Sequence, residues 1–255
     1  MIERLNTLDP GLAASGAARL VMLNGFMRSS PSPVEGISRA RYAEDLLEEA
    51  ISQGVRQYVL IGAGMDTFAF RRPDLNQNLQ LFEVDREEAQ RFKRQRLAEA
   101  EIEEPGNLHF VTVDFSQESL DTALARSEYD PTAPAFFGWL GVSPFLHNDT
   151  VLDTLRAIKR TAAKGSHVVF DYIDDDAFDP DKASKGIREL IASLRSRDPF
   201  SAGFDPDSLR RELIQTVFQV RENLGPSDIE TRYFQERNDG FHAAEHAHFA
   251  WAVVE

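Results

Sequence analysis

VLIGAGMDTFAF, the stretch from Val59 to Phe70, runs from an apolar strand directly into a Gly62-Ala63-Gly64 turn. Glycine permits positive φ angles and a close approach of the backbone to a ligand. Free N–H groups at the start of the following helix then face that ligand. We therefore predict that Gly62, Ala63 and Gly64 bind a nucleotide-like cofactor at the edge of an α/β sheet.

Outward from this stretch, the chain alternates β-branched or aromatic runs with segments that are apolar at three- and four-residue spacing. This alternation predicts one doubly wound α/β domain over residues 1–255, with a parallel sheet and crossover helices. The predicted strands span residues 57–61, 79–84, 108–113, 135–140, 167–171, 217–223 and 249–254. The predicted helices span residues 41–52, 86–101, 150–163 and 207–215.

Composition and charge narrow the class of protein. The chain has no Cys, which excludes disulfides, thiolate metal ligands and a Cys nucleophile. Its formal net charge of −14 opposes binding to phosphate backbones or anionic membranes, so nucleic acid is not an expected partner. The sequence lacks a run of about 18 apolar residues, and its N-terminus does not resemble a secretory signal. We expect a cytoplasmic enzyme without a membrane span.

An acidic residue ends the next strand, LQLFEVD, and lies 21 residues after Gly64. This is about the interval at which a carboxylate meets both ribose hydroxyls in a nucleotide-binding βαβ unit. We therefore predict that Asp85 binds the cofactor, and the structural alternative is that it caps the helix that opens at Arg86. Glu83 has the same strand parity but lies one pleat deeper, and the alternative for it is an ion pair with a basic neighbour.

The motif also discriminates between cofactors. A dinucleotide fingerprint needs a third glycine where this chain has Thr67, which counts against NAD or FAD. The P-loop pattern of nucleoside triphosphatases is absent as well. S-adenosylmethionine needs the glycine turn and the ribose acid but has no pyrophosphate. The sequence therefore favours a methyltransferase.

A third strand supports this interpretation, since VTVDF ends in Asp114 and Phe115. Asp114 is predicted to bind the adenine amino group, and Phe115 to contact the ring through its side chain or backbone N–H. The structural alternatives are a cap before Ser116 for the acid and core packing for the aromatic.

Taken together, VLIGAGMDTFAFR, FEVD, AFFGWLGVSPFLHNDTV and HVVFDYI resemble the leucine carboxyl methyltransferase family of class I S-adenosylmethionine-dependent methyltransferases. The resemblance runs from about residue 39 to residue 172 of this chain, with a weaker echo at 233–240. It implies a Rossmann-like seven-stranded sheet with helices on both faces and an antiparallel last strand. It also implies transfer of a methyl group to an oxygen of a small molecule or a carboxylate, with S-adenosylhomocysteine as product.

The same resemblance implies an arginine just before the first sheet helix that holds the methionine carboxylate of the cofactor. Arg39 matches that position best, and Arg41 is the alternative. A planar guanidinium suits this task because it grips a carboxylate with two parallel bonds. The chain departs from the family at Leu140, where many relatives carry an acidic residue, but the position is still expected to contact the cofactor.

The methyl acceptor is expected beyond the fourth and fifth strands, where Trp139, His147 and Tyr172 are the candidate residues and Asp171 is expected to line the pocket. Residues 1–38 are predicted to form an N-terminal helical cover, and residues 174–206 an insert over the acceptor site. An ionised carboxylate acceptor needs no base, whereas a hydroxyl acceptor does.

A histidine-rich run near the C-terminus contains metal-ligand residue types at close spacing: His242, Glu245, His246 and His248. The pattern is not that of a known zinc helix, so we expect no metal site and place the run in a loop near the acceptor pocket. Two other functions stay open from the residues: a non-catalytic S-adenosylmethionine-binding protein, and a nicotinamide-dependent enzyme on a similar sheet.

Overall fold

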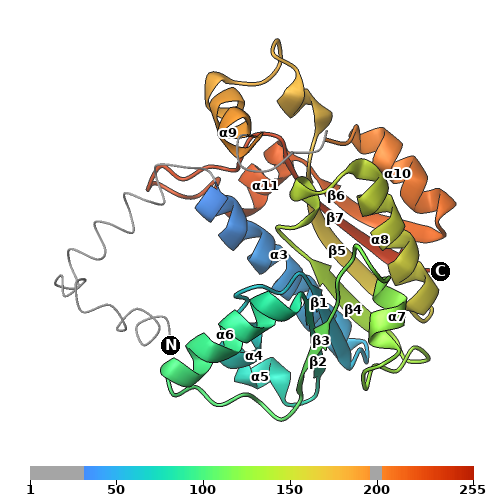
Figure 1. The fold of residues 1–255 in the computed structure, drawn as a ribbon. Helices are drawn as coiled ribbons and strands as arrows, with labels where there is room; N and C mark the ends of the chain where they lie inside the picture. Colours follow the sequence, from blue (N-terminus) through green and yellow to red (C-terminus); the bar gives the residue numbers. More distant parts are fainter. Residues whose placement is uncertain (1–31, 196–202) are drawn as a thin grey trace.

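A seven-stranded sheet forms the centre of the molecule in a computed structural model that describes residues 32–195 and 203–255 (Figure 1). Its strands are β1 (Gln57–Ile61), β2 (Gln80–Asp85), β3 (Leu108–Thr112), β4 (Ala135–Trp139), β5 (His167–Ile173), β6 (Phe218–Leu224) and β7 (Ala247–Val254). They lie in the order β3-β2-β1-β4-β5-β7-β6. β1 to β5 pair in parallel, whereas β7 runs antiparallel to both β5 and β6. The predicted seven-stranded α/β sheet with an antiparallel last strand is therefore confirmed.

Helices cover both faces of this sheet. They are α3 (Ser32–Ser52), α4 (Phe68–Arg71), α5 (Pro73–Asn76), α6 (Glu87–Glu99), α7 (Leu120–Leu124), α8 (Asn148–Thr161), α9 (Lys185–Arg195), α10 (Pro206–Gln215) and α11 (Pro226–Tyr233), with short 3₁₀ helices η2 (Ser143–Phe145) and η3 (Asp175–Phe178). Apolar side chains of α7, α8 and α10 pack in one core cluster, and those of α3, α4 and α11 pack in another.

The two clusters follow from the alternation of side chains along buried strands. All residues of β1 are buried. Val59 and Ile61 belong to the cluster under α8, whereas Tyr58 and Leu60 belong to the cluster under α3. Because both faces of β1 are covered, a ligand can reach this strand only at its ends. The carboxyl end of β1 is followed directly by the glycine turn.

The helices differ from the prediction at several places. α3 begins at Ser32 rather than at residue 41, although Gly36 lowers helix propensity in its first turns. Val34 packs in the same cluster as Leu46, so tertiary contacts extend the helix toward the N-terminus. α9 and α11 were not predicted. α9 packs in a small apolar cluster of its own with η3, away from the main core.

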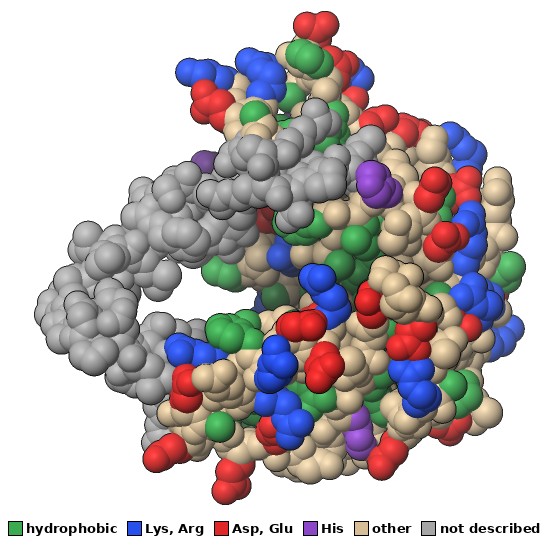
Figure 2. Space-filling view, in the orientation of Figure 1, with side chains coloured by type: hydrophobic (Ala, Val, Ile, Leu, Met, Phe, Trp, Pro, Cys, Tyr) green, Lys and Arg blue, Asp and Glu red, His purple; other side chains and the backbone are tan. Residues whose placement is uncertain are grey.

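Only part of the predicted N-terminal cover lies within the described residues, since 32–38 form the first turns of α3. The predicted insert 174–206 contains η3 and α9, which lie together at one end of the molecule (Figure 1). None of the helices in residues 32–195 and 203–255 is long and apolar enough to cross a membrane. On the face shown in Figure 2, acidic and basic side chains are interspersed.

Candidate functional site

The carboxyl ends of the parallel strands meet at one edge of the sheet. This edge carries residues 62–64 after β1, Asp85 at the end of β2, Asp114 after β3, Leu140 after β4 and Asp171 in β5. Ligands of open α/β sheets bind outside such an edge, at the point where the strand order reverses. Here the order reverses between β1 and β4. The structure therefore brings the predicted glycine turn and the predicted acids to the same edge.

The glycine turn has a conformation that other residues rarely adopt. φ is +68° at Gly62 and +49° at Gly64. The turn is tied to the sheet by a 2.8 Å hydrogen bond from the Gly62 amide to the carbonyl of Val84. A Cβ atom built on Gly62 would lie 2.4 Å from Cγ2 of Val142, whereas one built on Gly64 meets nothing closer than 3.9 Å. Val142 therefore fills the space next to Gly62, whereas the space next to Gly64 is open.

Asp85 is half-buried beside this turn. Its Oδ2 accepts a 2.7 Å hydrogen bond from the Gly64 amide, and its Oδ1 accepts a 2.7 Å bond from the Arg86 amide. The predicted ribose acid and the predicted glycine turn are therefore joined directly. Each carboxylate oxygen has capacity for a further hydrogen bond.

Glu83 is buried, and its Oε2 lies 2.5 Å from Nζ of Lys93 in α6. Its other oxygen, Oε1, is buried without a hydrogen-bond partner in the described part of the chain. Burial raises the pKa of Glu83 to about 7, against the lowering effect of Lys93. Glu83 thus forms the ion pair with a basic neighbour that the sequence analysis gave as its alternative role.

Asp114 and Phe115 project from the end of β3. Asp114 Oδ1 accepts hydrogen bonds from the amide and the hydroxyl of Ser116, at 2.9 and 2.7 Å, as the structural alternative predicted. These bonds hold the carboxylate at the surface of the edge. Phe115 is 44% exposed, so core packing does not explain this aromatic residue.

An arginine on α3 reaches across to β5. Nη1 of Arg39 lies 3.0 Å from Oδ2 of Asp171 and 3.3 Å from Oε1 of Glu35. Asp171 is buried, and its Oδ1 accepts a 2.6 Å bond from the amide of Gly141. Asp171, the acid expected to line the acceptor pocket, therefore positions Arg39 and the loop after β4.

Glu35, which contacts Arg39, makes the stability of the fold depend on pH. Burial, followed by the charge of Asp171, raises its pKa from 4.5 to about 7. The folded state then binds more protons than the unfolded state between these values, so stability falls as the pH rises from about 4.5 to about 7. Glu35→Gln should therefore gain stability relative to wild type across that window, by about 1–2 kcal/mol, in urea unfolding at several pH values. A constant difference would contradict this expectation.

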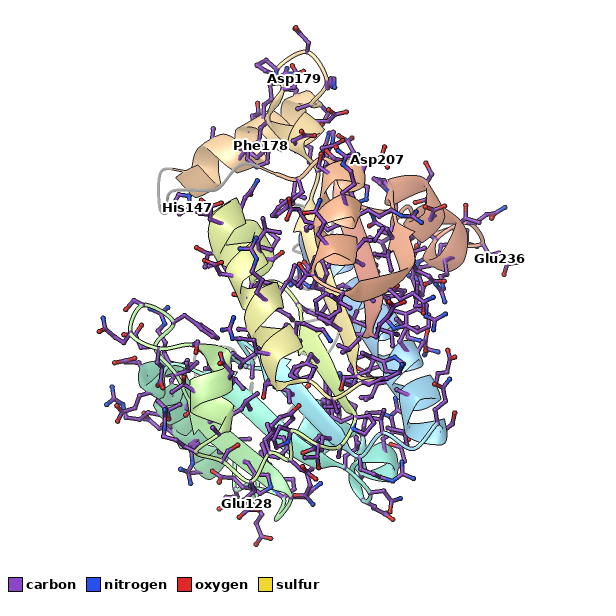
Figure 3. The ribbon with its side chains drawn as sticks, turned by 90° about the vertical axis from the view of Figure 1, so that its right-hand side faces the viewer. Glu128, His147, Phe178, Asp179, Asp207 and Glu236 are labelled. Carbon is purple, nitrogen blue, oxygen red and sulfur yellow. The ribbon has the colours of Figure 1, made fainter. Side chains whose placement is uncertain are left out.

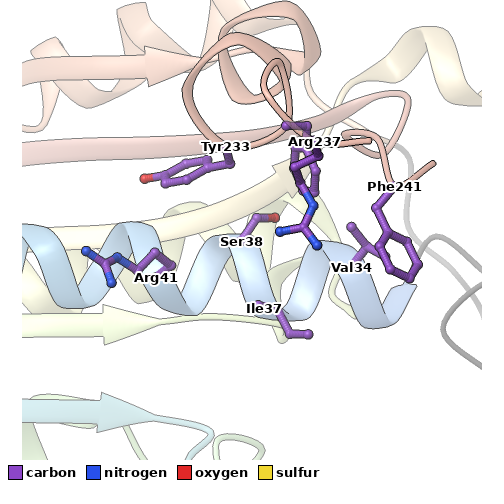
Figure 4. Close-up of a pocket in the computed structure, with 8 residues that line it drawn as sticks. Val34, Ile37, Ser38, Arg41, Tyr233, Arg237 and Phe241 are labelled. Atoms are coloured by element: carbon purple, nitrogen blue, oxygen red, sulfur yellow. The ribbon is translucent and has the colours of Figure 1, made fainter. Parts of the chain in front are cut away.

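Arg41, the alternative to Arg39, lies on another face of α3. Its side chain is 69% exposed and pairs with Asp45 at 2.8 Å. It borders a pocket of about 190 Å³ between α3, α11 and the loop that follows α11, as Figure 4 shows. This pocket is lined by Val34, Ile37, Ser38, Arg41, Tyr233, Phe234, Arg237 and Phe241. The structure therefore brings Arg39, and not Arg41, to the edge that carries Asp85.

Two of the acceptor-side candidates are core residues. Trp139 is 1% exposed and packs against Phe170. Tyr172 is 2% exposed, and its hydroxyl bonds to Oδ1 of Asn223 at 2.9 Å. Leu140 is half-buried and packs on the cluster under α3. Trp139 and Tyr172 thus shape the edge through their packing and their backbone.

The third acceptor-side candidate, His147, is exposed at the start of α8. Figure 3 shows it at the same end of the molecule as Phe178, Asp179 and Asp207, with Glu128 at the opposite end. It lies near the predicted insert, since the side-chain amide of Asn148 bonds to the carbonyl of Gly203 at 3.0 Å.

The C-terminal histidines separate into two places. His242 lies 2.9 Å from Oε1 of Glu230 on α11. His246 and His248 instead both contact Asp174, the first residue of the predicted insert, and this contact was not predicted from the sequence. The spacing of these two histidines is the signal in the sequence that could have grouped them, since His248 lies in β7 and His246 directly precedes that strand. Within residues 32–195 and 203–255, no group of three or more His, Cys, Asp and Glu side chains is arranged to hold a metal ion.

Comparison with known proteins gives a consistent family match. The family model described as "Leucine carboxyl methyltransferase" matches residues 28–159. The putative S-adenosyl-L-methionine-dependent methyltransferase YktD of Bacillus subtilis is 34% identical over 225 residues, which cover 88% of this chain and 73% of YktD. A putative methyltransferase of the same description from Frankia alni is 36% identical over 132 residues, but the chain covers only 46% of its length.

Solved structures share the fold. A putative methyltransferase from Thermobifida fusca has a TM-score of 0.61 at 16% identity, covering 87% of this chain and 81% of that one. A DUF574 family protein from Streptomyces avermitilis has a TM-score of 0.58 at 13% identity, covering 87% and 82%. At these identities, the similarity shows a shared arrangement of sheet and helices and nothing beyond the fold.

Proposed function

Since this chain belongs to the leucine carboxyl methyltransferase family, we propose that its S-adenosylmethionine-dependent activity methylates an oxygen of a small molecule or a carboxylate. The observation that carries the proposal is the contact between Asp85 and the Gly64 amide. It joins a glycine turn and a ribose-type acid at the edge where the strand order reverses.

The residues at this edge fit an adenosyl ligand. Gly62, Ala63 and Gly64 would face its body, and Asp85 would accept hydrogen bonds from both ribose hydroxyls. Asp114 and Phe115 would bind the adenine. The open space at Gly64 and the capacity of the two Asp85 oxygens support this assignment.

Arg39 is our candidate for the methionine carboxylate, with Leu140 beside it. Both carboxylates that it contacts use Nη1, and in the described part of the chain its Nε and Nη2 make no hydrogen bond. A Cβ atom on Gly141 would lie 2.3 Å from Nη2, which places this nitrogen at the loop after β4. Two donors on a planar group remain for a carboxylate.

Bound S-adenosylmethionine supplies an electrophilic methyl carbon, and its other product is S-adenosylhomocysteine. The protein's contribution is to hold the acceptor oxygen in line with that carbon, which can account for much of the rate. Trp139 and Tyr172 would set the shape of the acceptor side through their packing. His147 and the described part of the predicted insert, residues 174–195 and 203–206, would contact the acceptor.

Calorimetric titration with S-adenosylmethionine, S-adenosylhomocysteine and NAD tests the cofactor assignment. The proposal expects binding of both adenosyl ligands and no binding of NAD. Binding of NAD alone would support the nicotinamide-dependent alternative. Adenosyl binding without methyl transfer to either hydroxyl or carboxylate acceptors would support a non-catalytic binding protein.

Gly64→Ala should weaken S-adenosylmethionine binding by about tenfold or more, because its methyl group would occupy the open face of the turn. The positive φ adds a destabilisation of about 1–2 kcal/mol. Gly54→Ala is the matched control, since Gly54 has φ +102° and open space in a turn after α3. Equal affinity in the two variants would remove Gly64 from the cofactor site.

A further inference from the structure

Two histidines share one carboxylate just beyond the carboxyl end of β5. Oδ1 of Asp174 lies 2.7 Å from Nδ1 of His246, and Oδ2 lies 3.1 Å from Nε2 of His248. The three side chains are between 10% and 15% exposed. The amide of Ala177 also donates to Oδ1 at 3.2 Å. Asp174 therefore acts as the centre of a nearly buried network that contains two imidazoles.

The backbone of His246 is fixed to the same residue. The Asp174 amide donates a 3.0 Å hydrogen bond to the His246 carbonyl. His246 has φ +66°, a left-handed conformation that costs of order 1–3 kcal/mol for a residue with a side chain. Such strain persists only where the surroundings enforce it, and it is concentrated at functional sites. Both backbone and side chain of His246 are thus held in one orientation.

The two imidazoles present different nitrogens. His248 uses Nε2 for Asp174, and its Nδ1 is buried without a partner. His246 uses Nδ1 for Asp174, and among the described residues its Nε2 has no hydrogen-bond partner. A carboxylate that accepts the Nδ1–H bond leaves Nε2 with the free lone pair. His246 is therefore the imidazole that can take a proton from another molecule.

The network lies at the same edge of the sheet as the proposed cofactor site. β7 runs antiparallel to β5 and pairs Ala247 with Ile173, so the start of β7 lies at the carboxyl end of β5. β7 is two strands away from β4, a separation of about 10 Å. This separation suits an acceptor whose hydroxyl oxygen lies over β5, between the methyl group at the end of β4 and Nε2 of His246.

The surroundings of the network are acidic and aromatic. Tyr172 stacks on His248 with ring centroids 4.8 Å apart. Burial, followed by the charges of Asp174, Asp205 and Asp207, raises the pKa of Tyr172 above its usual range. Asp205 and Asp207 lie at the start of α10, so negative charge approaches the histidines from this element as well. Negative charge stabilises an imidazolium once it has formed.

We propose that His246 is the general base for methylation of an alcohol or phenol and that Asp174 is its positioning residue. The inference rests on the proposed function and names the acceptor class. A carboxylate acceptor is already ionised at neutral pH, so a positioned base would have no task with it.

The step balances without a further reactant. As the acceptor oxygen bonds to the methyl carbon, the carbon–sulfur bond breaks and its electron pair stays on sulfur. The hydroxyl proton passes to Nε2 of His246, and Asp174 stabilises the resulting imidazolium through Nδ1. The imidazolium then releases the proton to water.

The test compares His246→Gln, Asp174→Asn and the control His242→Gln, whose histidine contacts Glu230 instead. S-adenosylhomocysteine formation is followed with phenols and aliphatic alcohols, and with carboxylic acids of the same skeletons. On hydroxyl acceptors, His246→Gln should lower kcat/KM by about 10²–10⁴-fold. The wild-type pH profile should lose rate toward low pH with a single protonation, and this limb should shift in Asp174→Asn.

A second readout does not depend on turnover. ¹⁵N NMR of the imidazole should show neutral His246 as the Nδ1–H tautomer in the wild type. The Nε2–H tautomer would overturn the inference, as would methylation of carboxylic acids alone or unchanged hydroxyl activity in His246→Gln. Calorimetry distinguishes failure of this inference from failure of the proposed function, because folded protein that binds no S-adenosylmethionine overturns the proposed function itself.

Discussion

Asp85→Ala should weaken S-adenosylmethionine binding by about 100-fold or more, because two hydrogen bonds to a charged acceptor contribute about 1.5 kcal/mol or more each. The variant also removes the acceptor of the Gly64 amide, so the glycine turn loses the contact that orients it. Isothermal titration with S-adenosylmethionine and S-adenosylhomocysteine measures the loss.

Two further variants make this measurement specific. Asp85→Asn retains one acceptor oxygen for the Gly64 amide and should bind with intermediate affinity. Asp153→Ala removes a carboxylate that is 73% exposed on α8 and should bind as the wild type does. If Asp85→Ala binds both adenosyl ligands normally while remaining folded, Asp85 is not the ribose acid.

Lys93→Met should destabilise the fold by about 3–5 kcal/mol at neutral to alkaline pH, because it leaves the buried carboxylate of Glu83 without its cation. The loss should be smaller at lower pH. The pKa of Glu83 is already raised to about 7 by burial, and loss of Lys93 raises it further, so the carboxyl binds a proton instead. Urea unfolding on both sides of this pKa measures the difference.

A double variant separates the lost pair from the lost side-chain volume. Glu83→Met combined with Lys93→Met replaces both charges with apolar groups and should regain most of the stability. Arg96→Met removes a half-exposed partner of Glu99 on the same helix and should change stability by less than about 1 kcal/mol. An effect of Lys93→Met no larger than this control would show that the pair does not carry the expected energy.

The sheet could be predicted from the sequence because its strands are buried on both faces. β1 was predicted with its observed bounds, since a continuous apolar run ends at a glycine turn. The acids after successive strands were also predictable, because parallel strands bring their carboxyl ends to one edge. Asp85 and Asp114 lie at that edge as expected, although their roles toward a cofactor stay predictions.

Contacts between distant segments were not predictable in the same way. Arg39 and Asp171 are 132 residues apart, and Asp174 and His246 are 72 residues apart. Each pair depends on how α3 or β7 packs on β5, and local periodicity carries no information about such packing. Trp139 shows that the direction of a single side chain was not predictable either. Its place at the end of β4 was predictable, but the face toward which its side chain points was not.

The closed space behind the glycine turn has a consequence for the evolution of this family. A side chain at position 62 and the γ-methyl group of Val142 would compete for the same volume. The loop after β1 and the loop after β4 therefore pack so closely that one added carbon atom at position 62 would clash with Val142. Relatives that replace the glycine should carry glycine or alanine at the position of Val142, so that the two positions covary.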